Sequence, residues 1–391
     1  MEPWPVPDNA SSITRPHRIW LVNQFVPPDL APTARLLGDL SEGLGNRGWT
    51  LHFLGRKAGY RAKSVTGLQR WLRDLGAHVS LFVRGLFAPR PDIILCLTDP
   101  PALVFTMKWL SFLRGAELVH WPMDVYPQIA VALGALNSSS TLYKVIDAAS
   151  SWAIRRSAAV VCLDDDMRRA LSLPAAAVIP PWVSREIRIP EHPPVPGETK
   201  ITWLYSGNLG RAHDFETVLR AQKVLEEAGA PFELVFQGGG ACLPPAQALA
   251  AELGFHSCRW QGYANDQQLV ASLLAAHVVV ATQREETRGL LWPSKLALLQ
   301  ALPRPILWIG APAGAIAASL RSRPGLNGVF APGEATQLAQ WLLSHAEDFK
   351  AAARQPASPQ AIREHLASTR EKSLDAWHQL LGQVLSSRPC A

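Results

Sequence analysis

Short apolar segments alternate with helical patterns along almost the whole chain, and this alternation occurs twice. The first series favours strands at residues 18–23, 50–54, 91–97, 117–121, 158–163 and 177–181. The second series favours strands at residues 202–205, 232–237, 258–261, 277–282 and 305–309. Several segments are continuously apolar, as expected for parallel strands that are covered on both faces. The pattern predicts an α/β protein with two doubly wound parallel-sheet (Rossmann-like) domains.

A proline-rich stretch at residues 189–199 separates the two series and is the clearest predicted linker. The remaining predicted boundaries are a loose tail at 1–16, domains at 17–188 and 200–355, and a helical region at 356–391 that packs across the domains. Ligands of doubly wound sheets bind at the carboxyl ends of the strands. We therefore expect the two domains to face each other across a cleft that holds the site.

The chain is basic, and its formal net charge of +6 comes entirely from residues 1–190. Basic residues cluster in this half at Arg56, Lys57, Arg61, Lys63, Arg70 and Arg73. Such a cluster can contact an anionic membrane surface or a phosphate-bearing acceptor. It is equally compatible with a solvated basic face.

Cysteine usage and hydropathy favour a cytoplasmic protein. The five cysteines are scattered without a C-x-x-C pair, so we expect neither a zinc site nor disulfides. Residues 1–16 are polar and proline-rich, unlike a signal peptide. No apolar run reaches the roughly 20 residues that cross a bilayer. The apolar stretch at 102–113 contains Lys108 and is expected to be a buried or interfacial helix.

Two cationic turns in the second series point to a bound diphosphate. Residues 205–211 combine Gly207, Gly210 and Arg211 between a predicted strand and a predicted helix. Backbone N–H groups of such a turn, together with a helix N-terminus, can bind phosphate. Pro293-Ser294-Lys295 opens another predicted helix and supplies a second cation. The alternative for Lys295 is a surface lysine at a helix start.

Two further segments of the second half lie near these turns. Gly238 and Gly239 follow a predicted strand and would allow close approach of a base or ribose, or else form a flexible turn. Residues 284–289 contain Glu286, which could hold ribose or sugar hydroxyls, and Arg288, which could touch phosphate. An exposed charged loop is the alternative for this segment.

Asp124 is the candidate acid–base group of the first half. It follows a predicted buried strand, so its carboxylate would face the cleft and accept a proton from a hydroxyl. The alternative is an aspartate held in a turn. His120 lies inside the strand and is more typical of a core histidine. Asp164, Asp165 and Asp166 precede a helical pattern, so we expect them to cap that helix and not to bind a metal.

These motifs, in this order, resemble the retaining family 4 glycosyltransferases of GT-B fold, and most closely their bacterial exopolysaccharide branch of colanic-acid type. The resemblance covers residues 18–385. It rests on segments 25–29, 98–101 and 124–134 in the first half, and on 205–211, 293–296 and 304–306 in the second half.

The resemblance implies transfer of a sugar from a nucleotide-diphosphate donor, a UDP-sugar above all, to a hydroxyl of a glycan or a polyprenyl-diphosphate-linked acceptor. It implies no metal or other cofactor, no nucleic-acid partner, and a location in the cytoplasm or at the inner face of the membrane. The implied catalytic residues are Asp124, Arg211 and Lys295. The implied donor contacts are Gly207, Asn208, Gly210, Gly238, Gly239, Glu286, Arg288 and Ser294, and the implied acceptor contacts are Pro28, Asp29, Asp99 and His120.

Two positions depart from the family pattern. Leu298 stands where an acidic residue that grips the donor ribose often follows the Pro-Ser-Lys turn, and Gln300, Ala301 and Leu302 supply no carboxylate. Gln128 stands where the family usually has glutamate, which bears on acceptor recognition. Two other functions therefore remain open: a GT-B nucleotide-sugar epimerase, and a protein that binds a nucleotide sugar without turnover.

Overall fold

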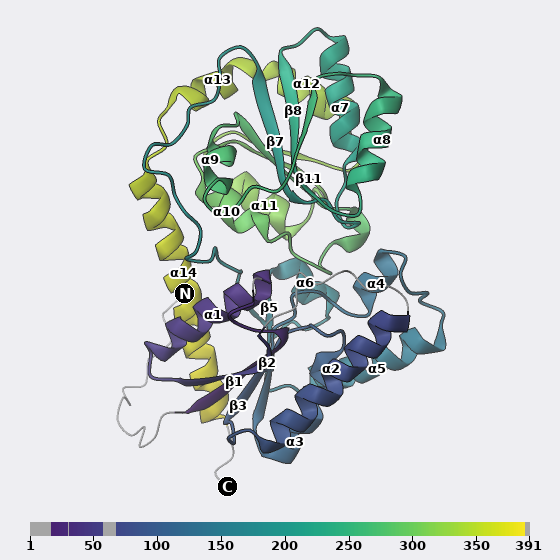
Figure 1. The fold of residues 1–391 in the computed structure, drawn as a ribbon, viewed down its shortest axis with the longest axis vertical. Coiled ribbons are helices and arrows are strands. Elements are labelled where there is room, and N and C mark those ends of the chain that lie inside the picture. Colours follow the sequence, from purple (N-terminus) through teal and green to yellow (C-terminus); the bar gives the residue numbers. More distant parts are fainter. Residues whose placement is uncertain (1–16, 30, 58–67, 388–391) are drawn as a thin grey trace.

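The computed structural model describes residues 17–29, 31–57 and 68–387, and it places two parallel sheets one above the other (Figure 1). Each sheet has six strands, and every pairing within the two sheets is parallel. The predicted pair of doubly wound sheets is confirmed.

The first sheet has the order β2-β1-β3-β4-β5-β6. Its strands are β1 (Arg18–Phe25), β2 (Thr50–Arg56), β3 (Ile93–Cys96), β4 (Glu117–His120), β5 (Ala159–Cys162) and β6 (Ala177–Val178). Its helices are α1 (Pro32–Gly45), α2 (Leu68–Phe87), α3 (Leu103–Arg114), α4 (Gln128–Ala132), α5 (Thr141–Arg155) and α6 (Asp165–Ala170). The chain then runs from 179 to 200 without a helix or strand.

The second sheet has the order β12-β11-β10-β7-β8-β9. Its strands are β7 (Ile201–Asn208), β8 (Phe232–Gly239), β9 (Cys258–Gln261), β10 (Val278–Thr282), β11 (Ile306–Ile309) and β12 (Asn327–Phe330). Its helices are α7 (Glu216–Glu227), α8 (Leu243–Leu253), α9 (Leu269–Leu274), η1 (Glu285–Thr287), α10 (Lys295–Ala301), α11 (Ala315–Ser322), α12 (Ala335–Ser344) and α13 (Ala346–Arg354). Strand β12 was not expected, because its sequence, Asn-Gly-Val-Phe, is short and begins with two weak strand formers.

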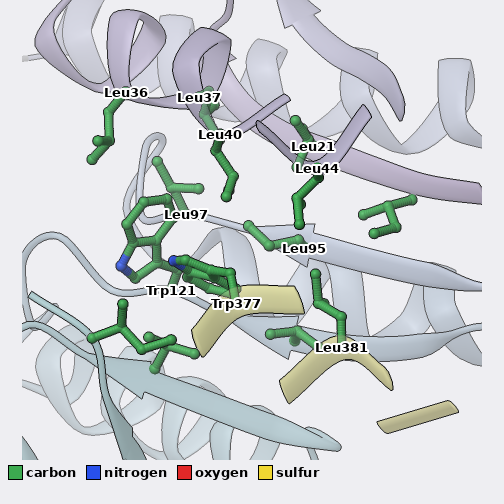
Figure 2. Close-up of a cluster of buried hydrophobic side chains, with 14 of the residues drawn as sticks. Leu21, Leu36, Leu37, Leu40, Leu44, Leu95, Leu97, Trp121, Trp377 and Leu381 are labelled. Atoms are coloured by element: carbon green, nitrogen blue, oxygen red, sulfur yellow. The ribbon is translucent and has the colours of Figure 1, made fainter. Parts of the chain in front are cut away.

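Helix α14 (Pro359–Ser386) runs along one side of both sheets (Figure 1). Ile362, near its start, belongs to a hydrophobic cluster of the second sheet, whereas Trp377 and Leu381 belong to a cluster of the first. Figure 2 shows Trp377 and Leu381 among the leucines of α1 and the buried Trp121. The rings of Trp121 and Trp377 meet edge-on, with centroids 4.8 Å apart.

A glycine and a buried ion pair fix α14 against α1. A Cβ at Gly43 would lie 2.4 Å from a methyl carbon of Leu374, so a larger residue there would force the Leu374 side chain to move. The Arg370 guanidinium donates to the Asp39 carboxylate at 2.8 Å, and both side chains are buried. Trp182 donates to the same carboxylate, at 2.7 Å. Both charges therefore have the partners that burial requires.

Among the described residues, no helix combines the length and the apolarity that a bilayer crossing requires. Basic residues Arg61 and Lys63 of the predicted cluster lie outside the described residues, and the side chain of Arg70 is not described either.

Candidate active site

The second sheet changes winding direction between β7 and β10, and the candidate site lies at the carboxyl ends of these strands. Strand β7 ends with Gly207 and Asn208, and β10 ends with Thr282. Helix α10 begins at Lys295, whose side chain extends to the same place. Such a switch point is where doubly wound sheets hold their ligands.

The Lys295 ammonium is the most unusual group at this edge. Its Nζ is buried and has no hydrogen-bond partner among the described residues. It lies 3.4 Å from the centroid of the Tyr205 ring, which attracts a cation through its negative face. Burial lowers the pKa of the Lys295 ammonium well below its ordinary value. The charged form of Lys295 is therefore costly at this site, and an anion bound there would offset that cost.

His213 completes the surroundings of this lysine. Its Nδ1 lies 2.7 Å from the carbonyl oxygen of Thr282, and since a carbonyl only accepts, Nδ1 carries the proton. Burial, and to a smaller extent the nearby Lys295, lower the pKa of His213 to about 4. The imidazole is therefore neutral at pH 7 and does not compete with Lys295 for an anion.

Two glycines are required by the close approach of β7 and β8 at their carboxyl ends. Gly238 has φ +142°, and a Cβ there would lie 2.0 Å from the carbonyl oxygen of Gly207. Gly207 has φ +134°, and a Cβ there would lie 3.4 Å from the Lys295 Nζ. Gly238 and Gly239 are part of β8, so they do not form the flexible turn that was one of the two alternatives.

The predicted turn at 205–211 differs from the structure in one respect. Strand β7 continues through Asn208, and α7 begins only at Glu216. The Asp214 carboxylate accepts from the N–H of Thr217 at 3.0 Å, so an acidic side chain already occupies the start of α7. The start of this helix therefore lies farther along the chain than predicted, and phosphate binding there stays a prediction. The Gly207 end of β7 and the Lys295 side chain remain as the anion-binding features.

Arg211 is exposed on the loop between β7 and α7. Its guanidinium and that of Arg284 both lower the pKa of the Cys242 thiol, against a larger increase from burial. The Arg284 N–H donates to the carbonyl of Ala212 at 2.8 Å, which ties this loop to the end of β10. Arg211 thus lies on the same edge as Lys295, with its side chain free to turn toward a ligand.

Asn208 lies beside an exposed tyrosine from the loop after β9, and a Cβ at Gly210 would lie 3.2 Å from Asn208 Nδ2. The Tyr263 hydroxyl donates to Asn208 Oδ1 at 3.2 Å, and its ring lies over Gly239, whose added Cβ would meet it at 2.9 Å. The Leu209 N–H donates to the carbonyl of Gly239 at 2.6 Å. These contacts keep the glycine segments of β7 and β8 together at the rim of the site.

The segment at 284–289 is an exposed charged loop at one end and a bridge between the halves at the other. Glu286 is exposed and pairs with Arg284 at 3.7 Å. Arg288 donates to the Asp166 carboxylate at 3.1 Å and to the Ala313 carbonyl at 3.0 Å. Arg288 therefore joins the two halves in this structure, and a phosphate contact would require these bonds to break. Ser294 is exposed at the start of α10 and makes no capping bond.

Asp166 is the centre of this bridge. Its Oδ2 accepts from the N–H of Ala315 at 2.6 Å, at the start of α11. Its hydrogen bonds to Ala315, Arg169 and Arg288 lower its pKa, although burial acts in the opposite direction. Asp164 accepts from the N–H of Met167 at 2.8 Å and caps α6, as expected. Within the described residues, no group of three acidic, histidine or cysteine side chains could hold a metal ion.

The first sheet changes direction between β1 and β3, and the predicted acceptor residues lie near that point. The Gln24 N–H donates to the Asp99 carbonyl at 2.5 Å, and the Asp99 N–H donates to Asn23 Oδ1 at 3.3 Å. The Asp29 carboxylate is buried and accepts from the N–H of Ala31 at 2.9 Å, so it holds the start of α1. Pro28 is exposed.

Asp124 and His120 line one small cavity at the end of β4, which has room for about one water molecule. Thr98 and Ser150 also line it. Burial raises the pKa of the Asp124 carboxyl to about 6 and lowers the pKa of His120 to about 4. His120 Nδ1 donates to the Cys96 carbonyl at 3.1 Å, in agreement with a core histidine.

Asp124 also touches the second half directly. It forms a β-bridge with Leu291, and the Val125 N–H donates to the Leu290 carbonyl at 2.7 Å. Leu291, the partner of Asp124 in this bridge, lies four residues before Lys295 in the chain. The bridge therefore brings the segment of Asp124 close to the start of α10. A second contact joins the halves where Arg35 pairs with Asp266 at 2.9 Å.

Sequence reasoning missed three contributors to the site: Tyr205, His213 and Asp166. Tyr205 stands at the junction of the predicted strand and the predicted turn, and the contact of its ring with Lys295 depends on long-range packing. The sequence holds a signal for His213, since it follows the glycine turn by three residues. Asp166 was interpreted only with its own helix, because its partners lie more than a hundred residues away.

Comparisons with known proteins agree with this geometry. No protein-family model matches the sequence. The chain is 28% identical over 237 residues to a probable glycosyltransferase, WbjE of Pseudomonas aeruginosa, and the alignment covers 56% of this chain and 58% of that protein. The chain thus spans little more than half of that relative.

Two solved structures show the fold. Sucrose-phosphate synthase of Thermosynechococcus elongatus superimposes with a TM-score of 0.68 at 15% identity, over 95% of this chain and 100% of that one. Anabaena Alr3699/HepE in complex with UDP-glucose gives a TM-score of 0.60 at 14% identity, over 95% and 100% of the two chains. The two facing six-stranded parallel sheets of this chain are those of the GT-B glycosyltransferase fold.

Proposed function

We propose that the protein is a glycosyltransferase that moves a sugar from a nucleotide-diphosphate donor, a UDP-sugar, to a hydroxyl of a glycan or lipid-linked acceptor. The observation that carries the proposal is the buried Lys295 ammonium without a hydrogen-bond partner at the switch point of the second sheet. A diphosphate there would restore the charged form of Lys295, because an opposite charge at contact distance raises the pKa of an ammonium. The similarity to a probable glycosyltransferase supports the same activity.

In this proposal the donor lies on the second sheet and the acceptor on the first. Lys295 and Arg211 neutralise the charge that develops on the leaving diphosphate, which is the main catalytic effect available here. Gly207, Gly210, Asn208, Gly238 and Gly239 allow the donor to approach the backbone closely. We retain residues 17–188, 200–355 and 356–391 as the proposed domains.

We assign the reaction to the retaining class and the chain to the exopolysaccharide branch of family 4, on the motifs described above. The acceptor oxygen bonds to the anomeric carbon on the face from which the diphosphate departs, and the acceptor proton passes to a diphosphate oxygen. No protein nucleophile is needed. Asp124, with a pKa of about 6, contacts the acceptor as a carboxylate at pH 7 and orients its hydroxyl.

The Leu298 position, where a ribose-binding acid is often found, is buried and apolar. In this proposal the ribose is therefore held by backbone groups and by the residues at the rim of the site. Glu286 can reach the ribose only if its ion pair with Arg284 breaks. We further propose that the acceptor is lipid-linked and that the basic first half contacts an anionic membrane, as the net charge of residues 1–190 supports.

A panel of UDP-, GDP- and dTDP-sugars tests the function. The protein's melting temperature is measured with each, because a ligand present at a hundred times its Kd adds about 2.7 kcal/mol to stability. Nucleotide release from the stabilising donor is then measured with and without glycan acceptors. We expect one UDP-sugar to stabilise the protein and to release UDP faster with an acceptor.

Each other result contradicts the proposal in a recognisable way. Stabilisation without any nucleotide release would indicate a binding protein. Conversion of the donor sugar to its epimer without an acceptor would indicate an epimerase. If no nucleotide sugar stabilises the protein, Lys295 does not serve a diphosphate.

A further inference from the structure

Exposed apolar side chains gather on helices α2, α3 and α5 of the first half. Among the large hydrophobic side chains that are exposed in the described parts of the chain, all but Val195, Tyr263 and Leu343 lie on these three helices. An apolar surface of this extent marks an interaction site on a globular domain. Neither sheet's ligand site uses it.

Helix α2 carries the longest row of these side chains. Leu72, Leu75, Val79 and Val83 are all exposed and follow one another at spacings of three and four residues. This spacing places them on one stripe of the helix. The opposite side of α2 is the one that packs inward, through Ala77 and Leu81. Helix α2 is therefore amphipathic with its second apolar stripe turned away from the core.

Helix α3 lies beside α2. A Cβ at Gly85 would lie 2.4 Å from a methyl of Leu110, and His78 Nδ1 lies 2.7 Å from Thr106 Oγ1. Helix α3 thus contacts α2 through Thr106 and Leu110, while its exposed Trp109 stacks on Trp152 of α5, with ring centroids 5.7 Å apart. Phe112 is 76% exposed. We call the exposed apolar side chains of residues 71–83 and 109–113 the apolar face.

The charges around the apolar face are almost all positive. Helices α2 and α3 contain the basic residues Arg70, Arg73, Arg84, Lys108 and Arg114, and Asp74 is their one acidic residue. Arg84 and Arg114 donate to backbone carbonyls, which leaves their positive charge in place. Asp74 pairs with Arg73 at 3.2 Å, so Arg84, Lys108 and Arg114 supply the net positive charge beside the apolar side chains.

We propose that the apolar face docks the protein on an anionic lipid bilayer. Tryptophan and phenylalanine insert at the boundary between headgroups and acyl chains, and lysine and arginine around them attract anionic lipid. A second copy of the chain fits less well, because a symmetric contact would place the same positive charges against each other.

This inference deepens the proposed function and rests on it for its purpose. Helix α3 begins at Leu103, which lines the cavity of Asp124, and its exposed residues lie toward its other end. Helix α3 thus connects the Asp124 cavity, at its first turn, with the apolar face, at its last turns. With the apolar face docked on a bilayer, the lipid-linked acceptor would reach the protein by diffusion within the membrane.

Co-sedimentation of the full-length protein with vesicles tests the docking surface. Vesicles of phosphatidylcholine are compared with vesicles that also contain phosphatidylglycerol, at low and high salt. The wild type is expected to bind only the anionic vesicles, and less at high salt. Leu75→Ser combined with Phe112→Ser should weaken binding about 100-fold, since each buried side chain contributes about tenfold. Lys108→Gln should weaken it about fivefold.

Val195→Ser and Lys372→Gln are matched controls elsewhere on the surface, and both should bind as the wild type does. Failure of the wild type to bind anionic vesicles overturns the inference, as does normal binding by the Leu75/Phe112 variant. Sedimentation velocity tests the alternative that a second copy of the chain occupies the face. A wild type that is dimeric and a variant that is monomeric, with lipid binding unchanged, would support this alternative. A lower melting temperature of the variant without vesicles would indicate that another part of this chain covers the face.

The donor panel is run on the same protein preparations. If a nucleotide sugar stabilises the protein but the protein does not bind vesicles, only the proposed docking surface is overturned. A protein that binds anionic vesicles but no nucleotide sugar loses the proposed reaction, and the apolar face stands as a membrane contact of unknown purpose.

Discussion

The two halves of the molecule share one architecture but hold opposite charges at the carboxyl ends of their sheets. The second half buries the Lys295 ammonium, and burial lowers its pKa. The first half buries the Asp124 carboxyl, and burial raises its pKa to about 6. In both cases burial opposes the charged form, and the missing compensation indicates that a ligand belongs there.

The difference between the halves lies in what each group can do when it is paired. A lysine beside the backbone of glycines can bind a polyanion such as a diphosphate. A carboxyl group with a pKa near 6 exchanges its proton close to neutral pH and suits a hydroxyl. The β-bridge between Asp124 and Leu291 brings these two chemistries together. In the proposed function, the same fold therefore serves two ligands because the side chains of the two halves differ, whereas their strands are arranged alike.

The largest effect is expected from Lys295→Met, which removes the ammonium and keeps the length of the side chain. Turnover should fall about 100- to 1,000-fold, the cost of losing one charge-stabilising group. The unliganded protein should melt at the same or a higher temperature, because a buried unpaired cation has been removed. Steady-state kinetics and thermal melting measure the two effects.

Lys200→Met is the control, since Lys200 is exposed and pairs weakly with Glu233 at 3.8 Å. A Lys295→Met protein that melts lower and keeps its turnover would make Lys295 a structural residue, and the contrast between the halves would be lost.

Asp124→Asn tests the first half through pH. The folded-state pKa of about 6 lies above the unfolded value of 3.8, so the folded state binds the extra proton between these pH values. Stability therefore falls as pH rises from about 4 to about 6 and stays lower above that. The variant should be more stable than the wild type at pH 8, by up to about 3 kcal/mol, and equal to it below pH 4.

Denaturant unfolding at pH 4 and pH 8 measures this effect, and turnover by the wild type should rise through about pH 6 while that of the variant does not. If the stability difference is the same at both pH values, Asp124 is not buried as a titrating group.

Asp166→Ala addresses the contact that holds the halves together. Loss of charged hydrogen bonds to Arg288 and Ala315 should cost about 2 kcal/mol and raise KM more than it lowers kcat. Asp165→Ala, at the neighbouring exposed position, should change neither quantity, since Asp165 pairs only with Arg168 at the surface. An equal response of the two variants would mean that the bridge does not couple the halves.

The smallest effect is expected from Tyr205→Phe. The ring stays under the Lys295 ammonium, and only the hydroxyl bond to the Asn208 carbonyl at 3.0 Å is lost, for about 1 kcal/mol. Donor binding should be unchanged in a titration. Tyr205→Leu removes the ring, so it should weaken donor binding; if it does not, the contact between ring and cation has no part in the site.

The sequence by itself determined the two parallel sheets. Residues 93–97 and 278–281 are continuously apolar, and such runs are typical of parallel strands covered on both faces. It also pointed to Gly207 and Lys295, which the structure brings together, because their residue types and their places after a strand and before a helix are visible in the sequence. Local patterns of this kind depend on neighbours a few residues away, which the sequence displays.

The tertiary structure alone decided how these groups are used. Nothing near Lys295 in the sequence shows that its ammonium is buried over the Tyr205 ring. Nor does the sequence show that position 238 must be glycine because a Cβ there would lie 2.0 Å from the Gly207 carbonyl oxygen. Local sequence patterns also did not predict the hydrogen bond from the Ala315 N–H to Asp166 or the start of α7 at Glu216. Burial and pairing are properties of packed surfaces far apart in the chain, so they arise only when the chain has folded.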